Sequence, residues 1–172
     1  MSRLQPGVLS GDQLECVLVL DNIRSAYNVG AIFRTADAAG VTKVFLVGCT
    51  PCPIDRFGRA VPEIHKTALG AEQQVAWEYV ATAEAAVEHL APYAVVAVEQ
   101  GDDAQSIFTY QPTSPLALVF GNEITGVSEP LLTAAATIVD LPMWGSKESL
   151  NVSVSVGAAL YTVRYIQYEA RA

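Results

Sequence analysis

The stretch CVLVL at residues 16–20 is a continuous run of apolar residues. Similar short runs recur along the chain, at Lys43–Val47, Ala94–Val98 and Leu116–Phe120. Between the first two, residues 28–39 carry apolar side chains at helical spacing, and Gly40 is a typical helix stop. Continuous apolar runs are typical of parallel strands that are covered on both faces. The alternation therefore predicts an α/β fold with a mostly parallel sheet flanked by helices.

The rest of the chain continues the alternation. Strands are predicted at residues 75–80 and 137–141, and helices at residues 64–69, 82–90 and 129–136, with Thr82 and Ser128 as caps of the last two. Residues 48–62 are rich in Pro and Gly and are predicted to form a loop. Residues 151–168 fit both a strand and a helix, and their length favours a helix that is buried against the sheet.

The composition predicts one domain with a substantial core. The 172 residues are 51% hydrophobic and 16% charged, which excludes a disordered chain. We expect a single domain over residues 1–172, with residues 1–15 as a lead-in. The longest uncharged stretch, residues 104–122, is broken by polar residues and prolines, and no apolar run precedes Asp12, so neither a membrane span nor a signal peptide is expected.

The three cysteines, Cys16, Cys49 and Cys52, favour reduced thiols in a cytoplasmic protein, because the number is odd and no secretory signal is seen. Cys49 and Cys52 have redox or metal spacing, but a single pair without a nearby His favours an incidental arrangement. No metal site is predicted, and neither His65 nor His89 is assigned a role.

The distribution of charge is more informative than the net charge of −8. Residues 67–146 contain no Lys or Arg, whereas residues 21–70 contain six. An acidic protein can still bind a polyanion when its few cations converge on one face. A solvated acidic surface is the simpler reading of the charge by itself.

Common nucleotide and hydrolase motifs are absent from the sequence. No G-x-G-x-x-G follows a strand, Val127 stands where a P-loop would have its Lys, and no G-x-S-x-G occurs. Three polar clusters instead follow predicted strands, at residues 22–34, 120–126 and 141–153. Ligands of open α/β sheets collect at the carboxyl ends of strands, so these clusters predict a ligand site there. Gly121 is expected to allow a ligand to approach the backbone closely.

The three clusters resemble the three motifs of the SpoU (TrmH-type) branch of the SPOUT methyltransferase superfamily. Asn28 and Arg34 match the first motif, Gly121-Asn-Glu123 with Gly126 the second, and Ser149-Leu-Asn151-Val-Ser153 the third. The segment from Lys66 to Glu72 is also similar to a family segment. The resemblance implies S-adenosylmethionine as methyl donor, an RNA ribose 2′-hydroxyl in tRNA or rRNA as acceptor, a homodimer and a C-terminal trefoil knot.

The resemblance also implies roles for individual residues. The residues expected to contact the donor are Val98, Glu99, Gly121, Asn122, Leu141, Met143 and Leu150. The catalytic group is expected to comprise Arg34, Asn28, Glu123, Ser149 and Asn151. Because an arginine stays protonated, Arg34 is expected to stabilise the developing oxyanion and hold a neighbouring phosphate, with the proton leaving to water or a phosphate oxygen. The cations left for RNA contacts are Arg24, Arg56, Arg59, Lys66 and Lys147.

Two other functions stay open on the sequence. One is an RNA-binding member of the same fold without catalysis, and the other is an α/β enzyme that acts on a small nucleotide-like ligand. We expect neither a membrane nor DNA as a partner. The homodimer is expected to use the C-terminal helix through Val152, Val156, Ala159 and Val163, in a stretch, residues 149–163, that carries no charge.

Overall fold

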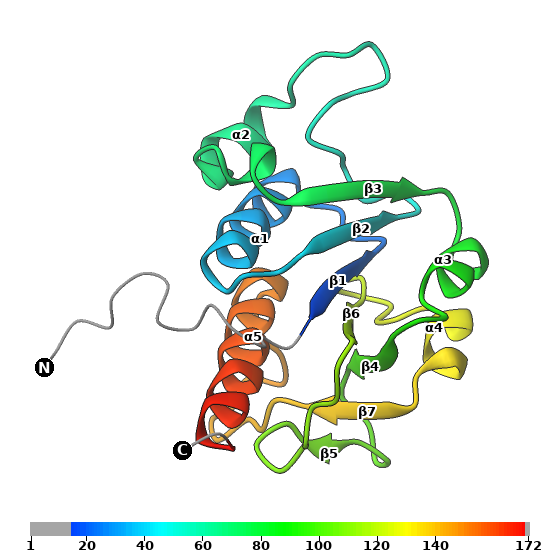
Figure 1. Ribbon diagram of the computed structural model, residues 1–172, viewed down its shortest axis with the longest axis vertical. Helices are drawn as coiled ribbons and strands as arrows, with labels where there is room; N and C mark the ends of the chain where they lie inside the picture. Colours follow the sequence, from blue (N-terminus) through cyan, green and yellow to red (C-terminus); the bar gives the residue numbers. More distant parts are fainter. Residues whose placement is uncertain (1–14, 171–172) are drawn as a thin grey trace, which may run out of the picture.

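The computed structural model describes residues 15–170. Seven parallel strands form one sheet in the order β3-β2-β1-β6-β4-β7-β5 (Figure 1). Their bounds are β1 Cys16–Asp21, β2 Lys43–Val47, β3 Ala76–Val80, β4 Ala94–Val98, β5 Gln105–Ser106, β6 Leu116–Phe120 and β7 Thr137–Asp140. The predicted parallel α/β fold is confirmed. The lead-in predicted for residues 1–15 lies almost entirely outside the described residues, and the division of the chain into domains stays a prediction.

Helices cover both faces of the sheet. In the described part of the chain the helices are α1 Ala26–Ala38, α2 Pro62–Ala68, α3 Ala83–His89, α4 Glu129–Ala134 and α5 Val152–Glu169, with a 3-10 turn at Ala71–Gln73. Figure 1 shows α1, α2 and α5 on one side of the sheet and α3 and α4 on the other. Within residues 15–170 no helix is long and apolar enough to cross a membrane.

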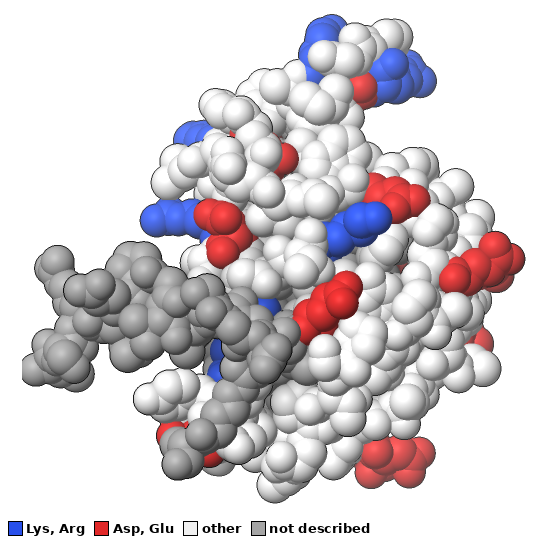
Figure 2. All heavy atoms as spheres, viewed as in Figure 1, with Lys and Arg blue, Asp and Glu red and all other residues white. Residues whose placement is uncertain are grey.

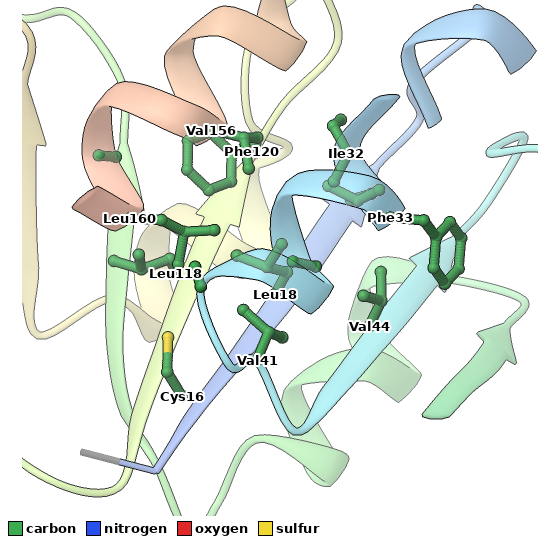
Figure 3. Close-up of a cluster of buried hydrophobic side chains, with 14 of the residues drawn as sticks. Cys16, Leu18, Ile32, Phe33, Val41, Val44, Leu118, Phe120, Val156 and Leu160 are labelled. Atoms are coloured by element: carbon green, nitrogen blue, oxygen red, sulfur yellow. The ribbon is translucent and has the colours of Figure 1, made fainter. Parts of the chain in front are cut away.

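Alternation along the strands divides the core into two layers. Leu18 and Leu20 of β1 pack in the cluster that includes α1 and α5, whereas Val17 and Val19 pack in the cluster that includes α3 and α4. Figure 3 shows the first layer, where Leu118 and Phe120 of β6 lie beside α5. Successive side chains of a strand point to opposite faces of the sheet. A sheet that is covered on both faces therefore needs strands that are apolar at every position.

Several predicted boundaries are wrong by a few residues. The first helix begins at Ala26, because the Ser25 hydroxyl accepts a hydrogen bond from Asn28 N (3.3 Å) and caps it. Helix α2 begins at Pro62, because the fixed φ of proline fits the first turn of a helix. Strand β3 begins at Ala76, after a 3-10 turn at residues 71–73 that the sequence did not reveal. The two-residue strand β5 was also missed, because it is too short to give a pattern.

The caps of α3 and α4 differ from each other. Thr82 caps α3 as predicted, accepting a hydrogen bond from Ala85 N (3.2 Å). Ser128 precedes α4, yet its hydroxyl makes no capping bond, and its oxygen is buried without a hydrogen-bond partner among residues 15–170. Helix α4 ends at Ala134, two residues earlier than predicted.

The C-terminal stretch is a helix of 18 residues, which settles the ambiguity of its pattern. Val152, Val156, Ala159 and Val163 are all buried in the core of this chain. The prediction that these four residues form a dimer interface is therefore wrong, because the sheet and α1 already cover them. The knot that the resemblance implies stays a prediction.

Candidate active site

A cavity opens where β4, β6 and β7 end, at the carboxyl edge of the sheet. Its walls come from the ends of these strands, from the loop before α5 and from the start of α5. The lining residues are Val98, Glu99, Gln100, Phe120, Gly121, Asn122, Glu123, Leu141, Met143, Ser149, Leu150, Val152 and Ser155. All seven residues that were expected to contact a methyl donor are in this set. The structure thus brings them together, whereas their role in binding stays a prediction.

The loop after β6 is shaped by two glycines and a carboxylate. A Cβ on Gly121 would lie 2.1 Å from Gly126 C and from Val127 N. Asn122 and Gly126 exchange two backbone hydrogen bonds of 3.0 and 2.9 Å, and Gly126 has a φ of 72°. Glu99 Oε2 accepts from Val127 N at 2.8 Å. The close approach that was predicted for a ligand at Gly121 is therefore made by the chain's own loop, and this requires glycine.

A second set of contacts joins this loop to the end of β1. Asp21 is fully buried, and its Oδ2 accepts from Ser128 N (2.7 Å). Asn122 Nδ2 donates to the carbonyl of Asn22 (2.8 Å), and Asn122 Oδ1 accepts from Ile124 N (2.9 Å). A buried carboxylate that accepts backbone hydrogen bonds holds its donors in place. These bonds fix the cavity floor between the first and second polar clusters.

The first, second and third clusters meet at the rim of the cavity. Asn28 Nδ2 donates to Glu123 Oε1 at 3.3 Å, and Asn151 Nδ2 donates to Asn28 Oδ1 at 3.2 Å. Asn151 also caps α5, since its Oδ1 accepts from Ser153 N (2.8 Å) and from the Ser153 hydroxyl (2.6 Å). Glu123 and Ser149 line the cavity itself. Four of the five predicted catalytic residues therefore lie in or beside one site.

Arg34, the fifth, lines a different groove. Its side chain is exposed and lines a second groove between α1, α2 and α5, together with Lys66, Thr67, Leu69 and Tyr161. Arg34 is not among the residues that line the cavity at the carboxyl edge of the sheet, which is called the donor cavity below after the role predicted for it. Within residues 15–170, no hydrogen bond or ion pair joins Arg34 to the other four residues.

The five predicted RNA contacts are all exposed and come from four different segments of the chain. Arg56 and Arg59 stand in the loop between β2 and α2, where Figure 2 shows blue side chains gathered on a projection. Lys66 lines the groove with Arg34 and lies over the Tyr27 ring (5.9 Å to its centroid). Arg24 lies between β1 and α1, and Lys147 lies in the loop after β7. Two of the five, Arg56 and Arg59, share one loop.

Sequence reasoning missed Gln100 and Ser155, which line the cavity, and Asp21, which supports it. Phe120 and Val152 also line the cavity; they stand in the predicted polar clusters, but no role was assigned to them. Gln100 follows Glu99 directly, and its side chain donates to the Glu148 carbonyl across the cavity. Gln100 and Asp21 could have been found from the sequence, because both stand at or just after the end of a predicted strand. Val152 and Ser155 face the cavity because of the angle at which α5 starts, which no sequence pattern gives.

Histidine and cysteine side chains lie away from the cavity. His65 Nδ1 lies 2.7 Å from Glu72 Oε1. Burial would raise the pKa of Glu72, but this contact and backbone amides lower it. Burial raises the pKa of the Cys16 thiol to about 11, and Cys49 and Cys52 are free thiols. Over residues 15–170 no three His, Cys, Asp or Glu side chains are grouped as metal ligands would be.

The fold and the cavity define a class: a parallel α/β protein whose ligand site is built from loops at the carboxyl edge of the sheet. Residues 15–161 match the model of the SpoU rRNA Methylase family. The chain belongs to this family.

Individual relatives extend the comparison. The 23S rRNA (guanosine-2′-O-)-methyltransferase RlmB of Pseudomonas putida is 34% identical over 146 residues, which are 84% of this chain and 56% of the relative. An AdoMet-bound rRNA methyltransferase from Sinorhizobium meliloti is similar at a TM-score of 0.78 and 27% identity, over 89% of this chain and 57% of that one. A structure on the 2-OH methylation of C/U34 on tRNA is similar at a TM-score of 0.77 and 25% identity, over 91% of this chain and 98% of that one. The chain spans little more than half the length of the curated relatives that it matches.

Proposed function

We propose that this protein transfers the methyl group of S-adenosylmethionine to a ribose 2′-hydroxyl of an RNA. One observation carries the proposal: the seven residues expected to contact the donor line one cavity, and the Asn28–Glu123–Asn151 network lies at its rim. Membership of the SpoU family and the names of the relatives support the same chemistry.

The residues of the cavity suit S-adenosylmethionine. Val98, Leu141 and Leu150 give apolar walls for an adenine ring, as in other small-molecule sites with a few fixed polar groups. Two carboxylates, Glu99 and Glu123, also line the cavity, and negative charge favours a sulfonium cation. When bound, the donor supplies an electrophilic methyl group.

The residues at the rim would orient the ribose. The Asn28 amide holds the Glu123 carboxylate, and Asn151 holds Asn28, so all three have fixed orientations before any RNA arrives. Such preorganisation is what in-line transfer to a hydroxyl requires. Arg34 would stabilise the developing 2′-oxyanion and hold a neighbouring phosphate, because a guanidinium stays charged and donates several hydrogen bonds. The proton would leave to water or to a phosphate oxygen.

The proposal includes a homodimer, since Arg34 lines a groove other than the donor cavity. Tyr161 lines the groove with Arg34 and is exposed, as are Val154, Tyr165 and Tyr168 on the same helix. Exposed apolar surface of this kind marks interaction sites. A second copy packed on α5 would cover these side chains and bring Arg34 to an interface, from which it can serve the cavity of the partner. Sedimentation that shows a monomer at micromolar concentration would refute the dimer.

The RNA is either tRNA or rRNA. The curated relatives are named for guanosine methylation in 23S rRNA, whereas a structural neighbour of similar length concerns C/U34 of tRNA. Both RNA classes occur in the cytoplasm, where the odd number of cysteines led us to expect the protein. Mass spectrometry of nucleosides from cells with and without the protein identifies the methylated RNA and nucleotide.

The test of the proposal uses the purified protein with donor and RNA. Calorimetry should detect binding of S-adenosylmethionine and of S-adenosylhomocysteine, and tritium should pass from the labelled donor to bulk tRNA or rRNA. Donor binding without transfer to either RNA would favour a non-catalytic RNA-binding member. Failure to bind the donor would contradict the proposal and favour an enzyme acting on another small ligand.

A further inference from the structure

The loop between β2 and α2 carries an exposed aromatic ring between two arginines. The Phe57 side chain is 66% exposed, although burying a phenyl ring is normally favourable. The guanidinium carbons of Arg56 and Arg59 lie 4.8 and 5.0 Å from the centre of its ring. Figure 1 shows that this loop projects from the end of the sheet, and Figure 2 shows the basic side chains that gather on it.

The tip of the loop is held in one conformation by Asp55. Its Oδ1 accepts from the backbone amides of Phe57 (2.8 Å) and Arg59 (2.9 Å), and its Oδ2 accepts from Arg59 Nε (2.9 Å). These bonds from Arg59 lower the pKa of Asp55. Ile54 and Ala60 form an antiparallel bridge at the base of the tip. The ring is therefore presented by an ordered turn, so little entropy is lost when a partner binds it.

The charge of the tip is positive toward solvent. Asp55 is paired with Arg59 at 2.8 Å, whereas Arg56 has no ion pair with any residue from 15 to 170. Beside the tip lies a hollow whose walls include Arg56, Trp77 and Tyr79. Glu78, between the two aromatic residues, pairs instead with Lys43 (3.1 Å). The acidic side chains near the tip, Asp55 and Glu78, are therefore paired with cations. Single-stranded nucleic acids bind surfaces of this kind, where aromatic rings lie next to positive charges.

We propose that Phe57 stacks on an unpaired base of the RNA substrate, on the part of the ring from which the Arg56 guanidinium moves to hold an adjoining phosphate. The inference rests on the proposed function and adds a contact outside the donor cavity. Stacking on an aromatic ring is tolerant of base identity, and it requires a base that is not already stacked in a helix. The tip would therefore select RNA with a loop or a flexible end.

The test compares Phe57→Leu with Phe57→Tyr in the full chain. Leu is apolar but has no ring, and Tyr keeps the ring; neither changes the charge. The probes are a fluorescein-labelled RNA hairpin with an unpaired loop of seven nucleotides and a blunt RNA duplex, measured by polarisation at low salt. We expect Phe57→Leu to raise the Kd of the hairpin about fivefold or more, and Phe57→Tyr to leave it nearly unchanged.

The salt dependence of RNA binding distinguishes the contribution of the Phe57 ring from that of the Arg56 charge. The slope of log Kd against log salt should stay the same in Phe57→Leu, whereas Arg56→Gln should lower it by about 0.7, the contribution of one phosphate contact to a single strand. Methyl transfer should show a raised KM for RNA in Phe57→Leu, with the affinity for S-adenosylmethionine unchanged.

Three outcomes would overturn the inference. Unchanged hairpin affinity in Phe57→Leu would remove the stacking role, and an equal loss on the duplex would remove the preference for unpaired bases. If neither Phe57→Leu nor Arg56→Gln changes RNA affinity, and an acidic protein from the cell binds the tip, the tip is a docking site for a protein and not for RNA. A wild-type chain that binds the donor and no RNA would instead contradict the proposed function, so the two failures are distinguishable.

Discussion

The donor cavity and the loop of residues 48–61 differ in charge and in construction. The cavity is lined by two carboxylates and by uncharged polar and apolar side chains, which come from the ends of β4, β6 and β7, the loop before α5 and the start of α5. The loop carries two arginines around an exposed ring, and local bonds to Asp55 hold its tip. A chain with a net charge of −8 can thus keep the proposed RNA contacts away from the cavity that is proposed to bind a cationic donor. Each region can then be altered without the other.

Arg34→Ala should have the largest effect on catalysis. Loss of a group that stabilises a developing oxyanion typically costs about 10²–10³ in kcat. Donor affinity should stay within a few-fold, because Arg34 lies outside the donor cavity. Transfer assays and calorimetry on the same preparation measure both. Lys43→Ala is the control, since that cation pairs with Glu78 away from the cavity; lost donor binding in Arg34→Ala would make the arginine structural.

Gly121→Ala should disrupt the cavity next most strongly. Its Cβ would lie 2.1 Å from backbone atoms, which cannot give way as a flexible side chain can. Overpacking of this kind typically costs about 1–3 kcal/mol of stability. We expect a lower melting temperature and weaker donor binding. Gly101→Ala is the matched control because nothing lies within 4 Å of its added Cβ, and equal behaviour of the two variants would refute the packing argument.

Charge reversal in the loop should affect RNA and leave the donor alone. Arg56→Glu should weaken RNA binding several-fold and reduce the salt slope, as each phosphate contact contributes about 0.7–0.9. Arg59→Glu should weaken it further, because it also breaks the ion pair with Asp55 that orders the tip. Calorimetry with S-adenosylmethionine is the control measurement. Equal RNA affinity in wild type and both variants would contradict a role of the loop in RNA binding and would favour a loop that only connects β2 to α2.

The smallest effect expected is on thiol reactivity. Cys49 is exposed at the start of the loop, whereas Cys16 is buried in β1 with its pKa raised to about 11. Iodoacetamide at pH 8 should label Cys49 and leave Cys16 unmodified, since the thiolate is the reactive form. The raised pKa favours the folded state below the pKa of the unfolded thiol, and this contribution is lost as pH rises toward 11. Labelling of native Cys16 as fast as Cys49, read by mass spectrometry, would contradict its burial.

Much of the fold follows from local patterns in the sequence. Apolar runs such as residues 16–20 predicted parallel strands because burial on both faces needs an apolar side chain at every position. The ends of those strands predicted where a ligand site lies, since parallel strands finish at one edge of the sheet. By that rule Glu99, Asn122 and Met143 are expected near one another, and they line one cavity although Met143 lies 44 positions after Glu99.

Other features depended on contacts between distant segments. Val152 and Val156 were read as interface residues, yet they are core residues, because helical periodicity marks an apolar face without saying what covers it. Gly121 was read as an opening for a ligand, but the loop of Gly126 and Val127 occupies that space. The sequence also did not predict that Arg34 and Glu123 line different grooves, since this depends on how α1 packs against α2 and α5.

The sequence by itself determined the parallel sheet, its order of elements along the chain and the polar clusters at its carboxyl edge, because these follow from side-chain periodicity and chain direction. Only the tertiary structure decided which polar side chains meet. Asn28, Glu123 and Asn151 are joined across 123 residues of sequence by packing, and Phe57 lies between Arg56 and Arg59 because Asp55 turns the chain there. Distances between side chains depend on these packing angles and turns, which residue patterns do not specify.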